Sequence, residues 1–297
     1  MFASIVEIYC TIDEFCKEFE LGSSRLLTSS DNNKRNKPSR MSLSEIMTIV
    51  VLFHTSGYRT FKHYYQGCIA GHLNAYFPRA VSYNRFIELI PTSLMPLTVF
   101  LYGLRGKETG KYFADSTTLE VCHNRRAKRN KVFGGLAKKS KNSMGWFFGL
   151  KLHLVINDKG EIMSCCLTKG NVDDRSPVPK LVAKLKGWLF ADKGYLGLPL
   201  INKLKAQSME IFTKVRKGMK QRLRTMAQDF FLSKRGLIET VIDQLKNCCQ
   251  IEHSRHRSPI NAFVNIVSGI IAYCFKPRKP SIKSNRIYNS NSLLISN

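Results

Sequence analysis

Hydrophobic and polar residues follow a helical spacing over the first third of the chain. Apolar positions recur there at the period of a helix with one buried face. Helices are predicted at residues 5–19, 46–53, 61–76 and 83–102. Ser42 and Glu45 precede the second helix at the spacing of a capping box. The polar residues 28–40 are predicted to form an exposed loop.

From about residue 111 the pattern changes to short apolar runs that are typical of strands. Strands are predicted at residues 112–115, 146–156, 161–168, 188–191 and 211–215, with helices at 177–186 and 199–207. The sequence Asn157-Asp158-Lys159-Gly160 predicts a hairpin turn between the second and third strands. Two more helices begin near Ser233 and at Ser258-Pro259, where serine can cap the helix and proline suits its first position.

Positive charge is concentrated in the second part of the chain. Residues 1–100 contain 10 basic and 8 acidic side chains, which leaves 37 basic and 13 acidic ones for residues 101–297. The formal net charge is +26, and a surface this positive attracts a polyanion. Nucleic acid is therefore the predicted partner, and we expect it to contact mainly the second part.

A membrane and a zinc ion are both poorly matched to the sequence. The longest apolar segment, Ile260 to Phe275, contains two asparagines and is too short to cross a bilayer, so we interpret it as a buried core helix. The nine cysteines include no CxxC pair, and no secretory signal is recognised at the N-terminus. Cys122 and His123 lack a second ligand pair at zinc-knuckle spacing. Reduced thiols in a cytoplasm are predicted.

Two aspartates directly follow short apolar runs. Asp115 comes after Tyr112-Phe113-Ala114, and Asp192 comes after Trp188-Leu189-Phe190-Ala191. Each one alone has an ordinary alternative as a strand-end or turn residue. Two carboxylates at the ends of buried strands are costly without a partner, and a metal ion is a natural partner for both.

A third carboxylate lies on a predicted helix. At about 100° per residue, Arg235, Glu239 and Lys246 fall within a narrow arc at the edge of the apolar face. A solvent-exposed Arg–Glu pair would have the same spacing, and Asp243, further round the helix, fits that alternative better. Three carboxylates that converge would suit Mg²⁺, which prefers oxygen ligands and retains waters.

Together these segments resemble the DDE transposases of bacterial insertion sequences. The resemblance is carried by Tyr112-Phe113-Ala114-Asp115-Ser116, by Ala191-Asp192-Lys193-Gly194-Tyr195 and by Arg235-xxx-Glu239-x6-Lys246, in this order. It extends from about Ser42 to about Ile282 and is greatest to the insertion sequence 982 family. Related families have a tyrosine where this chain has Leu232, so the role of that tyrosine is in doubt here.

The resemblance implies an α/β fold, an RNase H-like mixed sheet flanked by helices, with an N-terminal helical domain. It implies that Asp115, Asp192 and Glu239 are catalytic and bind Mg²⁺ or Mn²⁺, with two ions per site. It also implies that Lys246 contacts DNA phosphate and that Arg235 supports the site. The reaction implied is hydrolysis at transposon ends, followed by attack of the freed 3′-OH on target DNA, both in-line phosphoryl transfers.

Two basic stretches are predicted to contact DNA phosphates. The first lies between the first two predicted strands, and no acidic residue occurs from Val121 to Lys141; a solvated loop is its alternative. The second follows the last predicted strand. The first stretch also includes Lys141, and the second runs from Lys214 to Arg224. The residues predicted to bind DNA are Arg125, Arg126, Lys128, Arg129, Lys131, Lys138 and Lys139 in the first stretch, and Lys214, Arg216 and Lys217 in the second.

We therefore predict three regions: a helical domain at 1–105 for DNA-end recognition or dimerisation, a catalytic domain at 106–275, and a basic flexible tail at 276–297. The predicted partner is double-stranded DNA, as transposon terminal inverted repeats and target, bound by a homodimer or larger assembly in the bacterial cytoplasm, at the nucleoid and not at a membrane. Two alternatives are a nuclease or resolvase of the same fold and a non-catalytic DNA-binding protein descended from a transposase. A strand-transfer assay separates them, because the first would cut without joining and the second would only bind.

Overall fold

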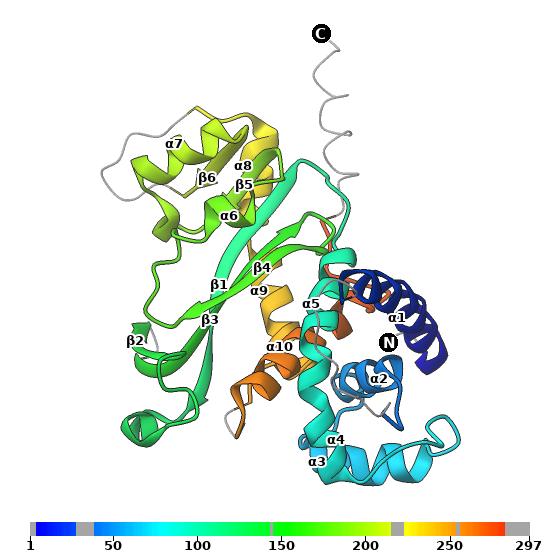
Figure 1. Cartoon of the computed structure of the whole chain (residues 1–297). Coiled ribbons are helices and arrows are strands. Elements are labelled where there is room, and N and C mark those ends of the chain that lie inside the picture. Colours follow the sequence, from blue (N-terminus) through cyan, green and yellow to red (C-terminus); the bar gives the residue numbers. More distant parts are fainter. Residues whose placement is uncertain (1–3, 28–38, 143–144, 215–222, 254–255, 283–297) are drawn as a thin grey trace. The chain divides into compact units, whose positions relative to one another are not determined.

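The protein consists of two compact units in a computed structural model (Figure 1). The structure describes residues 4–27, 39–142, 145–214, 223–253 and 256–282. The helical unit comprises Met1–Leu104 and Gln244–Pro277, and the sheet unit comprises Arg105–Asp243 and Arg278–Asn297. This division differs from the predicted boundary at 275. The segment after Asp243 packs with the N-terminal helices, because the apolar helix that it contains buries its side chains there.

The helical unit joins two parts of the chain around one apolar core. Its helices are α1 (Ile5–Leu27), α2 (Leu43–Phe53), α3 (Phe61–His63), η1 (Tyr64–His72), α4 (Tyr83–Leu89), η2 (Ile90–Ser93), α5 (Leu94–Gly103), η5 (Gln244–Cys248) and α10 (Pro259–Cys274). Helix α10 contacts both α2 and α5, and its central residues are buried. The prediction of a core helix at the apolar segment 260–275 is confirmed.

Local sequence patterns predicted some features of these helices correctly and others not. The Ser42 hydroxyl accepts a hydrogen bond from the Glu45 amide at 3.1 Å, and the Glu45 carboxylate accepts one from the Ser42 amide at 2.7 Å, so the predicted capping box is present. The helix predicted at 61–76 turns into a π-helix at Tyr64. The predicted loop 28–40 lies almost entirely outside the described residues.

One helical run of this unit, Tyr83–Gly103, is long and apolar enough to cross a membrane by length and composition alone. About 39% of its most apolar window is buried in the structure. Its last part, α5, packs against α1 and α10, and Phe100 lies 5.0 Å from the ring of Phe15. We interpret the run as part of the core of the helical unit.

A buried histidine links the two parts of the helical unit and predicts a pH-dependent stability. The ring of His54 contacts the Cys249 carbonyl oxygen through Nδ1 and the Ser268 hydroxyl through Nε2, at 2.5 and 3.0 Å. Burial lowers the pKa of His54 from 6.5 to about 4. Between these values the folded protein binds fewer protons than the unfolded chain. The free energy of unfolding is therefore expected to fall, by up to about 3 kcal/mol, as the pH decreases through this interval.

Amide hydrogen exchange in α2 and α10 at pH 7 and pH 5 measures this effect in the helical unit. His54→Gln removes the titrating ring and should flatten the pH dependence, although His256 contributes in the same direction because burial lowers its pKa to about 4 as well. His63→Gln, at an exposed position, is the control. An unchanged pH dependence in His54→Gln would contradict the assignment.

The sheet unit contains one mixed sheet. Its strands are β1 (Lys111–Cys122), β2 (Lys138–Asn142), β3 (Gly145–Asn157), β4 (Ile162–Lys169), β5 (Gly187–Ala191) and β6 (Met209–Thr213). The order is β2-β3-β1-β5-β6, and β4 also pairs with β3. Strand β1 is antiparallel to β3 and parallel to β5, and β6 is parallel to β5. This order and these directions confirm the predicted RNase H-like sheet.

Two strands differ from the sequence prediction. Strand β1 was expected to end at Asp115, but it continues through the polar residues Ser116 to Thr118, because β3 pairs with it as far as Cys122. Strand β2 was expected to be part of a basic loop, but Lys138 to Asn142 pair with the start of β3 at the sheet edge. The hairpin turn predicted between β3 and β4 is present, with Gly160 at φ 69°.

Helices cover both faces of the sheet. On one face α6 (Val178–Leu181) and α7 (Leu198–Ala206) pack against a core that includes Tyr112, Ala114, Leu189 and Ala191. On the other face α8 (Met226–Ser233) and α9 (Gly236–Asp243) contact strands β1, β5 and β6. Ser233 was expected to begin a helix, but α8 ends there and α9 begins at Gly236. Helix α6 is also shorter than the predicted helix 177–186.

Candidate active site

The sheet register places Asp115 and Asp192 at equivalent positions. Phe113 of β1 is opposite Phe190 of the parallel strand β5, and each aspartate comes two residues after its phenylalanine. Because side chains of a strand alternate between faces, Asp115 points to the same face as Phe113. The Phe113 and Phe190 rings are stacked with centroids 5.4 Å apart. Asp115, within β1, and Asp192, directly after β5, therefore lie on the face that α8 and α9 cover.

Helix α9 brings the third carboxylate to this face. Glu239 lies in the first turn of α9, which contacts β1. The guanidinium of Arg235, just before α9, donates to the Glu239 carboxylate at 2.7 Å and lies 4.0 Å from the Asp192 carboxylate. One arginine thus faces two of the three acidic groups. The side chains of Asp192 and Glu239 are 55% and 56% exposed, so both are open to a ligand.

Asp115 has the most buried environment of the three. Burial raises the pKa of Asp115 from 3.8 to about 6, while the Ser116 amide and Arg235 oppose the shift and Glu239 and Asp192 add to it. The Ser116 amide donates to the Asp115 carboxylate at 2.8 Å. The negative charges of the other two carboxylates thus contribute to the raised pKa of Asp115. A cation at this position would favour the charged form of all three groups.

The donor chemistry fits a hard divalent cation, because the predicted ligands are all carboxylate oxygens. Within the described part of the chain, however, no three acidic, histidine or cysteine side chains form a group close enough to hold a metal ion. Arg235 supplies the positive charge between Asp192 and Glu239. Ion binding would therefore require these side chains to rearrange.

A polar network on the opposite face of β1 was missed by the sequence analysis. The Ser116 hydroxyl donates to the Asp174 carboxylate at 2.7 Å, and the Lys151 ammonium donates to the same oxygen at 2.9 Å. Tyr195, three residues after Asp192, has Ser116 as a side-chain hydrogen-bond partner, and burial raises its pKa. Asp174 links Lys151 to Ser116, which directly follows Asp115, and no local pattern indicates this contact.

Asp174→Asn is expected to slow metal-dependent cleavage about tenfold, the lower end of the effect seen when groups that orient metal ligands are changed. The reason is that an amide at this position would leave the partly buried Lys151 ammonium without its carboxylate, so that Ser116 and Tyr195 are held less firmly. The rate at varied Mg²⁺ concentration measures the effect. Asp173→Asn is the matched control, since the Asp173 carboxylate pairs with the exposed Arg175 and not with this network. Equal rates for the two variants would contradict this role.

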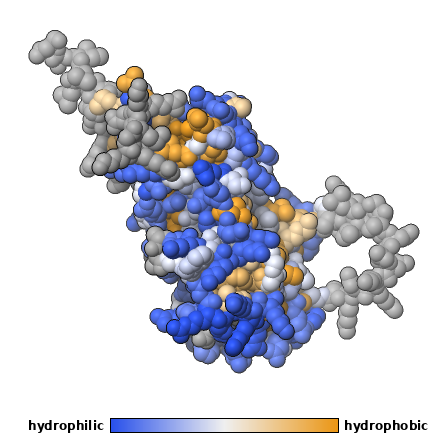
Figure 2. All heavy atoms as spheres, turned by 90° about the vertical axis from the view of Figure 1, so that its left-hand side faces the viewer, coloured by the Kyte–Doolittle hydropathy of each residue, from blue (hydrophilic) through white to orange (hydrophobic). Residues whose placement is uncertain are grey.

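The other residues predicted to contact DNA lie in several elements of the fold. Arg125, Arg126, Lys128 and Arg129 lie in η3 (Asn124–Arg129), and Lys138 and Lys139 lie in β2. The Lys139 ammonium lies 5.1 Å from the ring centre of the exposed Trp146. Figure 2 shows hydrophilic side chains over the lower part of the face that carries this region. Lys131 is exposed in the turn between η3 and β2.

Of the four remaining predicted contacts, the structure describes two, Lys214 and Lys246. Lys214 is exposed just after β6, and Arg216 and Lys217 lie outside the described residues. Lys246 belongs to the helical unit, where its ammonium pairs with Glu252 at 3.1 Å. The prediction that Lys246 shares a column with Glu239 assumed a regular α-helix. Residues from Gln244 to Cys248 form a π-helix, which holds more residues in each turn, so the angle between Glu239 and Lys246 differs from the assumed one, and the DNA contact of Lys246 stays a prediction.

The mixed sheet defines an RNase H-like α/β protein with one carboxylate within β1 and one directly after the neighbouring parallel strand β5. The family described as Transposase DDE domain matches residues 105–259, and the chain belongs to this family. The match begins where the sheet unit begins. This result confirms the predicted DDE transposase, while the narrower assignment to the insertion sequence 982 family remains a prediction.

Among solved structures, the chain is similar to the piggyBac transposase in a cryo-EM synaptic complex with hairpin DNA. The TM-score is 0.47 at 10% sequence identity, over 90% of this chain and 71% of that chain. No curated protein matches the chain.

Proposed function

We propose that this protein is a transposase that cleaves DNA at transposon ends and joins the freed 3′-OH to target DNA, using Asp115, Asp192 and Glu239. The observation that carries the proposal is the position of Asp115 and Asp192 after Phe113 and Phe190, which are register partners in parallel strands. Membership in the Transposase DDE domain family supports the same assignment.

The three carboxylates would hold two Mg²⁺ or Mn²⁺ ions. When bound, such ions activate the attacking oxygen and stabilise the leaving oxygen of an in-line displacement. Asp115 would anchor the buried side of the site, and Asp192 and Glu239 would close it from the exposed side. Arg235 offsets the charge of the last two before ions bind, and it would then be free to contact a phosphate.

The test of the proposed function is a strand-transfer assay with the full chain. The substrates are a duplex that carries the inverted repeats flanking the gene, and a supercoiled target. With Mg²⁺ we expect cleavage at the ends of the repeats, followed by a joined product. Cleavage without a joined product would instead indicate a nuclease, and binding without metal-dependent chemistry would indicate a DNA-binding protein without catalysis.

The basic segment η3 is expected to track DNA phosphates. Arg125→Gln combined with Arg126→Gln removes two exposed charges. If both contact phosphates, the slope of log affinity against log salt concentration should become shallower by about 1.8. Fluorescence anisotropy with a labelled end duplex measures the slope. A matched variant changes the exposed Lys203 and Lys205 of α7 to glutamine; equal slopes for the two variants would contradict a specific role of η3.

A further inference from the structure

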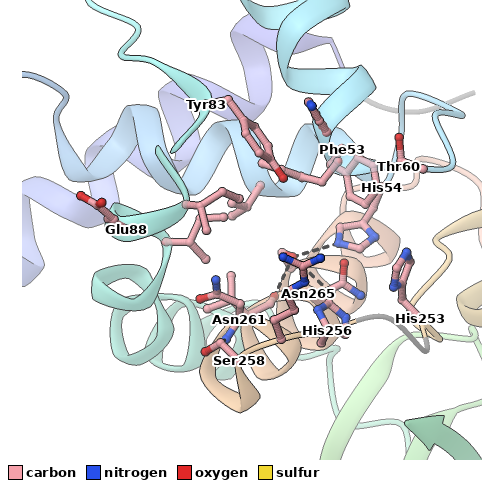
Figure 3. Close-up of a pocket in the computed structure, with 18 of the residues that line it drawn as sticks. Phe53, His54, Thr60, Tyr83, Glu88, His253, His256, Ser258, Asn261 and Asn265 are labelled. Carbon is pink, nitrogen blue, oxygen red and sulfur yellow. Dashed lines mark hydrogen bonds between the residues drawn. The ribbon is translucent and has the colours of Figure 1, made fainter. Parts of the chain in front are cut away.

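A pocket in the helical unit is separate from the residues of the carboxylate site. Its volume is about 790 Å³, within the range of sites for small molecules and cofactors. The lining residues lie between Val50 and Ile90, at His253 and between His256 and Ser268, and all of them belong to the helical unit. Figure 3 shows Tyr83 on one side of the space and Asn261 and His256 on the other. A ligand in this pocket would therefore contact none of the three carboxylates.

One wall of the pocket offers aromatic faces that are held in place. Phe61 and Tyr83 line the pocket. Phe61 is stacked on Phe86 with centroids 5.8 Å apart, and Tyr83 lies 6.1 Å from the ring of Tyr65. Phe86 and Tyr65 are almost fully buried. A flat aromatic ligand would find a fixed stacking platform here.

The opposite wall offers polar side chains that can form hydrogen bonds with a ligand. The side-chain oxygen of Asn261 is buried and has no hydrogen-bond partner among the described residues. Asn261 itself lines the pocket, where its side-chain amide can donate to the edge of a ligand. Burial lowers the pKa of His256 to about 4, which keeps its ring neutral at pH 7. Side-chain amides and neutral imidazoles can both donate to and accept from the edge of a base.

The charged groups at the pocket favour an anion on one side. Lys62 and Arg257 line it, and α10, with 16 residues, begins beside them after the cap Ser258. The start of a helix is its positive end and suits a phosphate. Glu88 also lines the pocket, and Figure 3 places it across from His253. A ligand that carries a phosphate matches the two basic side chains and this helix start.

We propose that this pocket binds one unstacked nucleotide, with its base against Phe61 and Tyr83, its edge at Asn261 and its phosphate at Arg257. An unpaired position in a DNA strand and a free nucleotide both present this chemistry. A base within a duplex does not, because its neighbours cover both faces, and extrusion costs least where the DNA is already unpaired. Because the chain belongs to a transposase family, the DNA strand is the source that we expect.

The test compares three duplexes of one sequence, bound by the full chain in EDTA so that no cleavage occurs. One is fully paired, one carries a single unpaired adenine nucleotide, and one carries a single unpaired abasic nucleotide. We expect the unpaired adenine to be bound about tenfold more tightly than the abasic nucleotide, equivalent to about 1.4 kcal/mol. The two unpaired duplexes share backbone charge and flexibility, so the ratio reports the base alone.

Two variants locate the effect in the pocket. Asn261→Asp replaces the amide donor with a negative charge, and Tyr83→Leu removes a stacking face at a half-buried position; both should bind the two unpaired duplexes equally. Arg79→Gln, exposed and outside the pocket, should keep the tenfold ratio. Circular dichroism checks the fold of each variant. If Asn261→Asp fails to fold, the Tyr83→Leu result alone decides.

Binding of free dAMP tests the other possible ligand of the pocket, a free nucleotide. Binding of dAMP that Tyr83→Leu loses supports a nucleotide site even if the duplexes are bound alike. The proposal is overturned if wild-type protein neither prefers the unpaired adenine nor binds dAMP, or if both variants keep the preference. Asp192→Asn should retain the tenfold ratio, since Asp192 is not in the pocket. Failure of the nucleotide site is thus distinguishable from failure of the proposed catalysis.

Discussion

Asp192→Asn is expected to abolish Mg²⁺-dependent cleavage of transposon ends, with a loss of at least about a thousandfold, or about 4 kcal/mol of transition-state stabilisation. Asparagine has nearly the shape of aspartate, but it lacks the charge and one of the oxygen ligands. Asp192 is 55% exposed and begins a short turn after β5, so the fold and DNA binding should persist. Cleavage of a labelled end duplex over time measures the loss.

Asp229→Asn is the matched control, because Asp229 is also 55% exposed and lies in the same unit. Asp229 pairs with Arg224, whose side chain is 13% exposed, and this pair includes none of the three carboxylates, so the cleavage rate should stay close to that of the unchanged protein. Asp192→Cys adds a readout that a structural role would not move: a softer thiolate should give more activity with Mn²⁺ than with Mg²⁺. Cleavage by Asp192→Asn at the normal rate would contradict the proposed mechanism.

Phe190→Ala is expected to destabilise the sheet unit by about 3–5 kcal/mol, the range for removal of a fully buried aromatic ring. Phe190 is fully buried, and its ring lies 5.4 to 5.9 Å from the rings of Phe113, Phe212 and Phe231. These rings hold β1, β5, β6 and α8 together. Because Asp192 follows β5, loss of this packing should also impair cleavage.

Urea unfolding followed by tryptophan fluorescence measures the change in the sheet unit. Both tryptophans of the chain, Trp146 and Trp188, lie in this unit and report on it. Phe230→Ala is the control, because Phe230 is only half-buried and contacts Phe231 from the side; its loss should be clearly smaller. Equal losses for the two variants would show that packing of these four rings does not stabilise the sheet as proposed.

In the proposed mechanism, Arg235 must move away from the carboxylates when metal ions bind. Its guanidinium bonds Glu239 and approaches Asp192, and it also lowers the pKa of Asp115 against the effect of burial. A cation that takes over this role would release Arg235 toward the DNA backbone. Arginine suits such a phosphate contact, because its donors match phosphate oxygens in pairs.

Local sequence determined the turns, caps and buried segments. Ser42 and Glu45 specify their capping box, Asn157 to Gly160 specify the hairpin, and the apolar runs before Asp115 and Asp192 specify two neighbouring strands. Such features depend on residues close together in the chain, so spacing alone reveals them. The order of the three acidic residues also indicated the family, which the match to residues 105–259 confirms.

Tertiary structure decided which residues share a surface. Pairing with β3 continues β1 through polar residues that alone resemble a loop, and the Ser116–Asp174 contact joins residues 58 positions apart. Burial of the apolar α10 against α2 and α5 assigns the segment after Asp243 to the helical unit. These outcomes depend on register and on burial of apolar surface between distant segments. Periodicity within one segment carries no information about either.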